Sequence, residues 1–309
     1  MIEDQFTVRA RMLFRSWNRL PENVRGIVAM LGAMAAFSFG DALMKLAADR
    51  FPTGEAIFLR GLMSMAAIWW LASRLGALSN VHLLRMPYLP TRTWADVAAS
   101  LLFIAALGRI PLADASAILQ TNPLAVTAGA ALFLGENVGW RRWTATAVGL
   151  LGVLMIIQPG SSAFSWASLL VIGAVIASAV RDLVTRKLPA IPTVLVTAAA
   201  VTATTLASLV LLPFETWTMP RFLDLVVLAI AGTCVLAGQF LVITSIRAGD
   251  VSAVVPFRYS AIVWSLLLSF IIWHHLPNAL TMLGIVVVSG AGLYTFYREE
   301  ALKRQGKFA

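Results

Sequence analysis

Several charged residues of this 309-residue sequence stand inside long apolar stretches, where each charge needs a partner or a water-lined cavity. Asp41 and Lys45 are four residues apart, so in a helix they share one face and can pair. Arg60 lies about one turn into the next apolar stretch and can share Asp41. We interpret the three as a charged cluster in the outer half of the bundle, which is an outer gate, an anchor for a substrate carboxylate, or a structural clamp between the first two helices.

Arg258 is the most informative single residue, because Pro256 beside it breaks a helical hydrogen-bond ladder and frees a carbonyl group. Phe257 and Tyr259 flank it with aromatic surface. A guanidinium beside aromatic rings suits a ligand with a carboxylate or phosphate and a flat or apolar body. The alternative is an arginine that snorkels to the surface or pairs with Asp250.

Uncharged polar residues occupy a comparable place earlier in the chain. Gln120 and Asn122 precede Pro123, and Gln239 lies in a later apolar run. Together with Trp264 these side chains are candidates for the lining of a polar cavity around Arg258. Each polar residue alone is equally explained by a single hydrogen bond between helices, worth about 0.6 kcal/mol.

The elements that must position these residues are apolar helices. Hydrophobic residues make up 59% of the chain and charged residues 13%, against about 25% charged in ordinary soluble domains. Lipid offers the backbone no hydrogen-bond partner, so each apolar run is expected to be a helix. We predict an all-α polytopic membrane protein with ten transmembrane helices, near residues 26–46, 56–74, 95–110, 114–134, 143–158, 167–183, 193–212, 223–243, 251–273 and 280–297.

The positions of the basic residues predict the orientation of the chain. The net charge of +9 is not gathered into a nucleic-acid-binding surface, because the Lys and Arg residues form short clusters between apolar runs. Most clusters lie in alternate connections and in the two tails, 1–25 and 298–309. This bias predicts a multi-pass protein of the inner (plasma) membrane with both termini in the cytoplasm.

The two halves of the chain, 26–158 and 167–297, form a weak internal repeat. Asp41 and Lys45 are matched 141 residues later by Asp182 and Arg186. Asp182 is thereby part of the candidate charged sites, and we expect it to be solvated near the cytoplasmic surface. Since five helices per half is an odd number, the halves must insert in opposite orientations. Such inverted repeats are typical of secondary transporters, whose binding site lies at mid-membrane between the repeats.

At this point the motifs resemble the EamA-type ten-helix permeases of the drug/metabolite transporter superfamily. The resemblance covers about residues 26–300 and rests on an ordered series of motifs: 111–115 (PLADA), 122–124 (NPL), 132–136 (LFLGE), 139–143 (GWRRW), 158–160 (QPG), 256–259 (PFRY), Trp264, 276–278 (LPN), Gly284, Gly290 and 292–294 (GLY). One departure is visible, since His274-His275 stands where the second repeat usually has Gly-Glu, as the first repeat has at Gly135-Glu136.

The resemblance implies two EamA repeats around a central cavity that opens alternately to either side. Amino acids are the expected substrates, and the alternative is a larger vitamin or coenzyme-like solute of the riboflavin or S-adenosylmethionine type. The expected partners are a small-molecule substrate and the lipid bilayer, with protons as a candidate coupling ion beside simple facilitated diffusion. We expect no cofactor, no metal and no nucleic acid, and a monomer or weak dimer.

An intramembrane enzyme or a scaffold is the competing class. The sequence contains no H-E-x-x-H zinc pattern, no G-x-S-x-G elbow and no phosphate-binding G-x-x-x-x-G-K-[ST] loop. Its single cysteine, Cys234, excludes a disulfide framework. A scaffold would be expected to carry larger loops. These observations favour a carrier over an enzyme.

Overall fold

The computed structural model describes residues 21–134, 140–161, 164–185, 191–248 and 254–304. These residues form eleven α-helices and three short 3-10 helices, with no β-strand among them. Seven of the helical segments are long and apolar enough to cross a membrane. The chain is therefore an all-helical polytopic membrane protein, as predicted. The motif at Gly135-Glu136, Asp250, Arg186 and most of the two tails lie outside the described residues.

The helices follow the predicted apolar runs closely. The α-helices are α2 (Glu22–Ala48), α3 (Thr53–Arg74), α4 (Leu89–Leu107), α5 (Leu112–Leu119), α6 (Asn122–Leu134), α7 (Trp140–Ile157), α8 (Ala167–Thr185), α9 (Thr193–Ser208), α10 (Phe222–Ala248), α12 (Ser260–Trp273) and α13 (Ala279–Arg304). The 3-10 helices are η1 (Ala77–Arg85), η2 (Leu212–Phe214) and η3 (Val255–Tyr259).

Two predicted runs are not single α-helices. The run 114–134 is divided into α5 and α6, so the described residues form eleven α-helices rather than the ten expected. Pro123 has no N–H to donate within the ladder, and the N–H of Leu124 bonds to the carbonyl of Thr121 at 2.9 Å, one residue short of the α pattern. The run 251–273 likewise passes through η3, which contains Pro256, before α12 begins.

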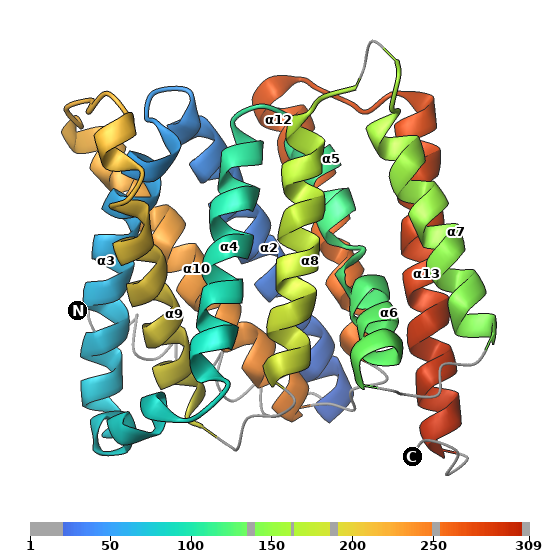
Figure 1. Cartoon of the computed structure of the whole chain (residues 1–309), viewed down its shortest axis with the longest axis horizontal. Helices are drawn as coiled ribbons and strands as arrows, with labels where there is room; N and C mark the ends of the chain where they lie inside the picture. Colours follow the sequence, from blue (N-terminus) through green and yellow to red (C-terminus); the bar gives the residue numbers. More distant parts are fainter. Residues whose placement is uncertain (1–20, 135–139, 162–163, 186–190, 249–253, 305–309) are drawn as a thin grey trace, which may run out of the picture.

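The helices stand side by side in one bundle, and the chain enters α2 and leaves α13 at the same end (Figure 1). The principal helix pairs are α2 with α10, α4 with α8, α3 with α9, and α7 with α13. Helices α7 and α13 approach each other closely, since a Cβ atom on Gly284 would lie 2.7 Å from the carbonyl oxygen of Gly152. Small residues therefore set the distance between helices, as is common in membranes.

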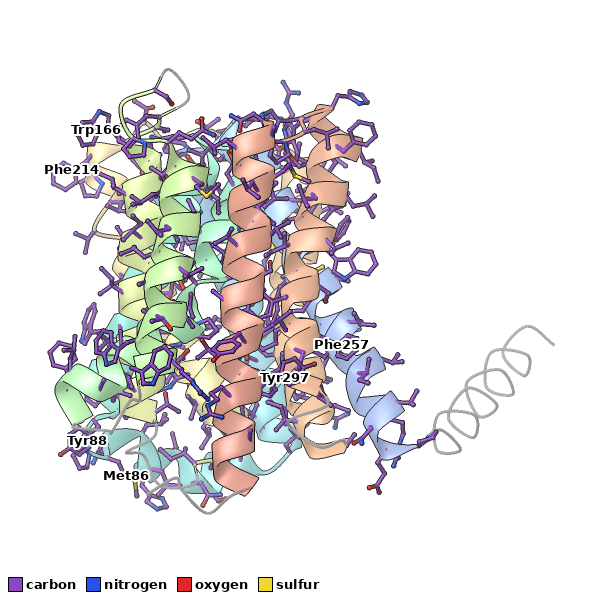
Figure 2. The ribbon with its side chains drawn as sticks, turned by 90° about the vertical axis from the view of Figure 1, so that its right-hand side faces the viewer. Met86, Tyr88, Trp166, Phe214, Phe257 and Tyr297 are labelled. Atoms are coloured by element: carbon purple, nitrogen blue, oxygen red, sulfur yellow. The ribbon has the colours of Figure 1, made fainter. Side chains whose placement is uncertain are left out.

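The outer surface of the bundle is apolar, with aromatic side chains near its two ends. Figure 2 shows Trp166 and Phe214 near one end and Tyr88 near the other. Aromatic belts of this kind mark the two membrane–water interfaces. Tryptophans near helix ends are exposed, namely Trp70, Trp140, Trp143, Trp166 and Trp217. Trp69 is different, because its indole N–H points inward and donates to Thr202 Oγ1 at 2.9 Å.

Candidate functional site

Two cavities inside the bundle contain most of the predicted site residues. The first, which we call the Arg258 cavity, measures about 250 Å³ and lies among α5, α6, α8, η3 and α13. Its lining includes seven predicted residues: Gln120, Asn122, Pro123, Asp182, Pro256, Arg258 and Tyr259. The sequence repeat and the helix breaks thus led to residues that do meet in space.

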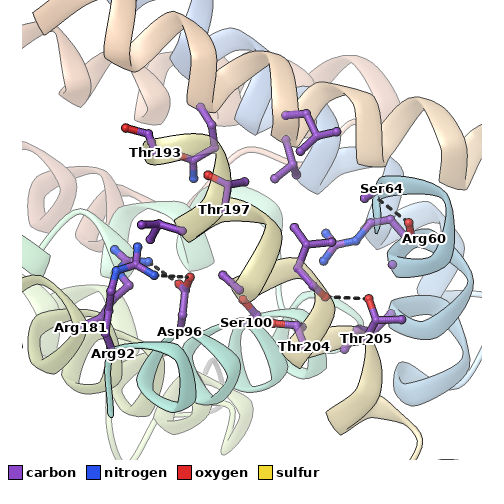
Figure 3. A pocket seen from close by; sticks show the side chains of 18 residues that line it. Arg60, Ser64, Arg92, Asp96, Ser100, Arg181, Thr193, Thr197, Thr204 and Thr205 are labelled. Carbon is purple, nitrogen blue, oxygen red and sulfur yellow. Dashed lines mark hydrogen bonds and ion pairs between the residues drawn. The ribbon is translucent and has the colours of Figure 1, made fainter. Parts of the chain in front are cut away.

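The second cavity, the hydroxyl cavity, measures about 230 Å³ and lies among α3, α4, α8, α9 and α10. Arg60 and Gln239 line it, so these two predicted residues are separated from the Arg258 group. Serine and threonine side chains from α3, α4 and α9 also line it, together with Arg92, Asp96 and Arg181 (Figure 3).

The helix breaks place the polar side chains at the Arg258 cavity. Gln120 follows the last turn of α5, and its side-chain amide donates to the backbone carbonyl of Arg258 at 2.6 Å. Asn122 starts α6, with Pro123 as the second residue, a position where proline costs little because that N–H has no helical partner. The break in each half of the chain therefore faces the break in the other.

The Arg258 guanidinium is the unsatisfied cation of this cavity. Its side chain is exposed, lines the cavity and makes no hydrogen bond within the described part of the chain. It interacts electrostatically with Asp182. Both oxygens of Asp182 already accept hydrogen bonds, Oδ2 from Asn122 Nδ2 at 2.8 Å and Oδ1 from Arg181 Nε at 2.9 Å. Among the described residues no hydrogen bond occupies the five guanidinium donors of Arg258, so they can serve a ligand in the cavity.

Tyr259 forms the wall next to Arg258 and approaches α13 at Gly292. A Cβ atom on Gly292 would collide with the hydroxyl group and ring of Tyr259, so only glycine leaves space for this ring. The hydroxyl group is buried and has no hydrogen-bond partner among the described residues. A buried hydroxyl normally finds a partner, and this one borders a cavity that a polar ligand can enter.

A network of ion pairs joins the two cavities, and sequence reasoning did not foresee it. Arg181 Nη1 binds Asp96 Oδ1 at 2.8 Å, which connects α8 to α4, and Arg92 lies 3.7 Å from the other oxygen of Asp96. Asp182 was expected to be solvated, but it is half-buried and partnered by Arg181 and Asn122. Only the pair of Arg92 and Asp96 could have been predicted, because residues four apart in one helix share a face and can form an ion pair.

The predicted cluster of Asp41, Lys45 and Arg60 is only partly assembled. Asp41 and Arg60 interact electrostatically. Lys45 does not form the expected ion pair with Asp41: its Nζ donates to the carbonyl oxygens of Leu107 and Ile110, both at 2.7 Å. Free carbonyls at the end of α4 are strong acceptors for an ammonium group, and they outcompete the carboxylate one turn away.

The remaining predicted aromatic residues lie elsewhere. Trp264 packs into an apolar cluster with Met30 and Met34 of α2 and lines neither cavity. Phe257 points to the outer surface and also lines neither (Figure 2). His274 ends α12 with φ = 51°, and His275 interacts electrostatically with Asp114 at the start of α5.

An apolar bundle with a polar cavity where two helix breaks meet is the arrangement expected of a membrane carrier. Comparisons with known proteins support a transporter. Residues 24–158 match the EamA-like transporter family, which confirms the resemblance to EamA-type permeases of the drug/metabolite transporter superfamily.

Characterised relatives extend over nearly the whole chain. A riboflavin transporter of Vibrio cholerae is 26% identical, over 93% of this chain and 98% of its own. An S-adenosylmethionine uptake transporter of Rickettsia prowazekii is 26% identical, over 90% and 94%. A pseudopaline exporter of Pseudomonas aeruginosa is 29% identical, over 84% and 92%. A solved crystal structure with 17% identity superposes with a TM-score of 0.63, over 90% and 99% of the two chains, which supports the fold.

These relatives bear on the predicted substrate. They support a permease rather than an enzyme, and none of the three is named for transport of a proteinogenic amino acid. The amino-acid substrate expected from the sequence is therefore unsupported. The alternative, a larger vitamin or coenzyme-like solute, fits the relatives better.

Proposed function

We propose that the protein is a secondary carrier of the inner membrane that moves a coenzyme-like organic solute, of the riboflavin or S-adenosylmethionine type, by alternating access. The observation that carries the proposal is the Arg258 guanidinium, which lines a cavity where two helix breaks meet and makes no hydrogen bond to the residues that the structure describes. Since both types of solute carry oxygen acceptors on a large organic body, they match a cation with five donors beside an aromatic wall.

The proposed architecture is ten membrane crossings in two inverted five-helix repeats. It counts α5 with α6 as one crossing and η3 with α12 as another. The helix packing supports it, because exchanging the halves preserves the pairs of neighbours. The pair α2–α10 corresponds to α8–α4, α2–α12 to α8–α6, and α3–α10 to α9–α4, while α3–α9 and α7–α13 correspond to themselves. Because the two halves are equivalent in this packing, each half can adopt the conformation of the other. The bundle then has two equivalent arrangements.

The proposed orientation has both termini in the cytoplasm. The Arg258 cavity lies beside the first residues of the ninth crossing, Val255–Tyr259, and beside Gly292 and Phe296 in the second half of α13. Both segments belong to the half of the bundle where α2 begins (Figure 1). With this orientation, the described conformation is the one that exchanges solute with the cytoplasm.

Transport by purified protein tests the proposal. Proteoliposomes loaded with unlabelled riboflavin or S-adenosylmethionine should accumulate the labelled compound by exchange, without chemical change. Arg258→Ala should reduce this exchange at least tenfold. The matched control is Arg74→Ala, because Arg74 stacks on Trp70 at the end of α3 and lines neither cavity. Exchange of amino acids but of neither larger solute would overturn the proposed substrate class. Repeating the assay with a pH gradient determines whether protons are coupled.

A further inference from the structure

The two cavities lie back to back against helix α8. Arg181 lines the hydroxyl cavity and Asp182, the next residue, lines the Arg258 cavity. The two side chains are bonded to each other, from Arg181 Nε to Asp182 Oδ1 at 2.9 Å. The wall between the cavities therefore includes a pair of neighbouring side chains.

This partition is held by hydrogen bonds to the helices on either side. Arg181 Nη1 reaches Asp96 Oδ1 of α4 at 2.8 Å, and Asp182 Oδ2 accepts from Asn122 Nδ2 of α6 at 2.8 Å. The side chains of Arg181, Asp96 and Asp182 are 27%, 18% and 33% exposed, so solvent and solute can reach them. A wall of partly exposed side chains can open by a change of rotamer, a motion that takes picoseconds to nanoseconds in exposed residues and requires no refolding.

The sizes of the cavities indicate that neither is a complete site. They measure about 250 and about 230 Å³, whereas pockets for drug-sized ligands occupy roughly 300–1,000 Å³. Joined through the partition, the two would fall within that range. A solute of the proposed size thus needs both.

The two ends of the joined cavity differ in chemistry. The hydroxyl cavity presents Ser100, Thr193, Thr197 and Thr204, whose hydroxyl groups make no hydrogen bonds within the described part of the chain (Figure 3). Hydroxyl groups both donate and accept, so they match a polyhydroxyl chain. The Arg258 cavity has a more apolar lining, with flat surface from Tyr259 and a guanidinium for carbonyl acceptors.

We propose that the two cavities are the two ends of a single binding site for a planar ring with carbonyl acceptors joined to a polyhydroxyl chain. The ring binds beside Arg258, the chain binds among the hydroxyl groups of α4 and α9, and the Arg181–Asp96 pair separates when the solute spans the partition. This inference rests on the proposed function and adds the orientation of the solute and its chemical class.

The test compares riboflavin with lumiflavin, which has the same ring without the polyhydroxyl chain. Binding to purified protein in nanodiscs is measured by quenching of flavin fluorescence. Riboflavin should bind at least tenfold more tightly than lumiflavin. In the double variant Thr197→Val, Thr204→Val the difference should disappear through weaker riboflavin binding, with lumiflavin binding unchanged. Arg258→Ala should weaken both.

The control is Thr233→Val on α10, since Thr233 bonds only to its own helix, at Ala229 O, and lines neither cavity. Equal affinities of the two flavins for the unaltered protein, or equal losses for both in the double variant, would overturn the inference. If riboflavin is nevertheless exchanged across liposomes, the proposed function stands and only the two-ended site is lost. If neither flavin binds but S-adenosylmethionine is exchanged, the inference is also wrong while the proposed function stands. If neither solute binds or is exchanged, both proposals fail.

Discussion

The contact between Tyr259 and Gly292 allows a sharp test of the packing around the Arg258 cavity. In Gly292→Ala the new methyl group would overlap the Tyr259 hydroxyl and ring, and α13 cannot retreat because it is packed closely on α7. The ring must therefore move toward the cavity. Overpacking of this kind costs about 1–3 kcal/mol of folding free energy, and the displaced ring should also weaken solute binding.

Gly290→Ala is the matched control, because no atom lies within 4 Å of the Cβ position at Gly290 on the same helix. Both substitutions gain the same helix propensity, about 0.5–1 kcal/mol, so their difference in stability isolates the overpacking. We expect Gly292→Ala to be less stable than Gly290→Ala by about 1–3 kcal/mol in denaturant unfolding in mixed micelles, and to bind riboflavin more weakly. Equal stability and equal affinity in the two variants would refute the described position of Tyr259.

Three further substitutions test contacts away from the cavities. Glu215→Ala removes the carboxylate that accepts hydrogen bonds from the backbone of Gly54 and its neighbour at the start of α3; a loss of about 1 kcal/mol in unfolding free energy is expected, and no loss would contradict the cap. Lys45→Met leaves two carbonyls at the end of α4 without their charged donor, so melting temperature should fall by the equivalent of about 1.5–3 kcal/mol while riboflavin affinity stays unchanged. Gly284→Val would drive a side chain into the Gly152 carbonyl and reduce the unfolding free energy by about 3 kcal/mol. A monodisperse gel-filtration peak of normal yield for this variant would show that α7 and α13 are not this close.

Composition and periodicity were sufficient to predict the helices, because a bilayer imposes one secondary structure on any long apolar run. The run that contains Pro123 was expected to stay whole, although Gln120, Thr121 and Asn122 beside it were the signs of a break. Apolar character alone does not reveal where a helix is interrupted. An interruption is tolerated only where neighbouring helices or a cavity provide hydrogen-bond partners for the freed backbone groups.

The sequence predicted part of the lining of the Arg258 cavity. Arg258 and Asn122 were found because charge and helix-breaking residues stand out in an apolar sequence, and both line one cavity. The partners of Lys45 could not be predicted, since they are backbone carbonyls more than 60 residues away that every sequence contains. Asp182 was expected to be solvated because its distance from the end of the run does not show which helix it faces.

The helix break between α5 and α6 has a consequence for how the solute preference of such proteins can change during evolution. The N–H of Leu124 bonds to the Thr121 carbonyl and Pro123 has no N–H to donate, so the main-chain oxygens of Leu119 and Gln120 are left outside the regular ladder beside the Arg258 cavity. This polarity belongs to the peptide chain and survives replacement of the side chains around it. Side chains around the break can therefore be replaced one at a time during evolution, which would alter the preferred solute. The backbone carbonyls would keep the cavity polar throughout.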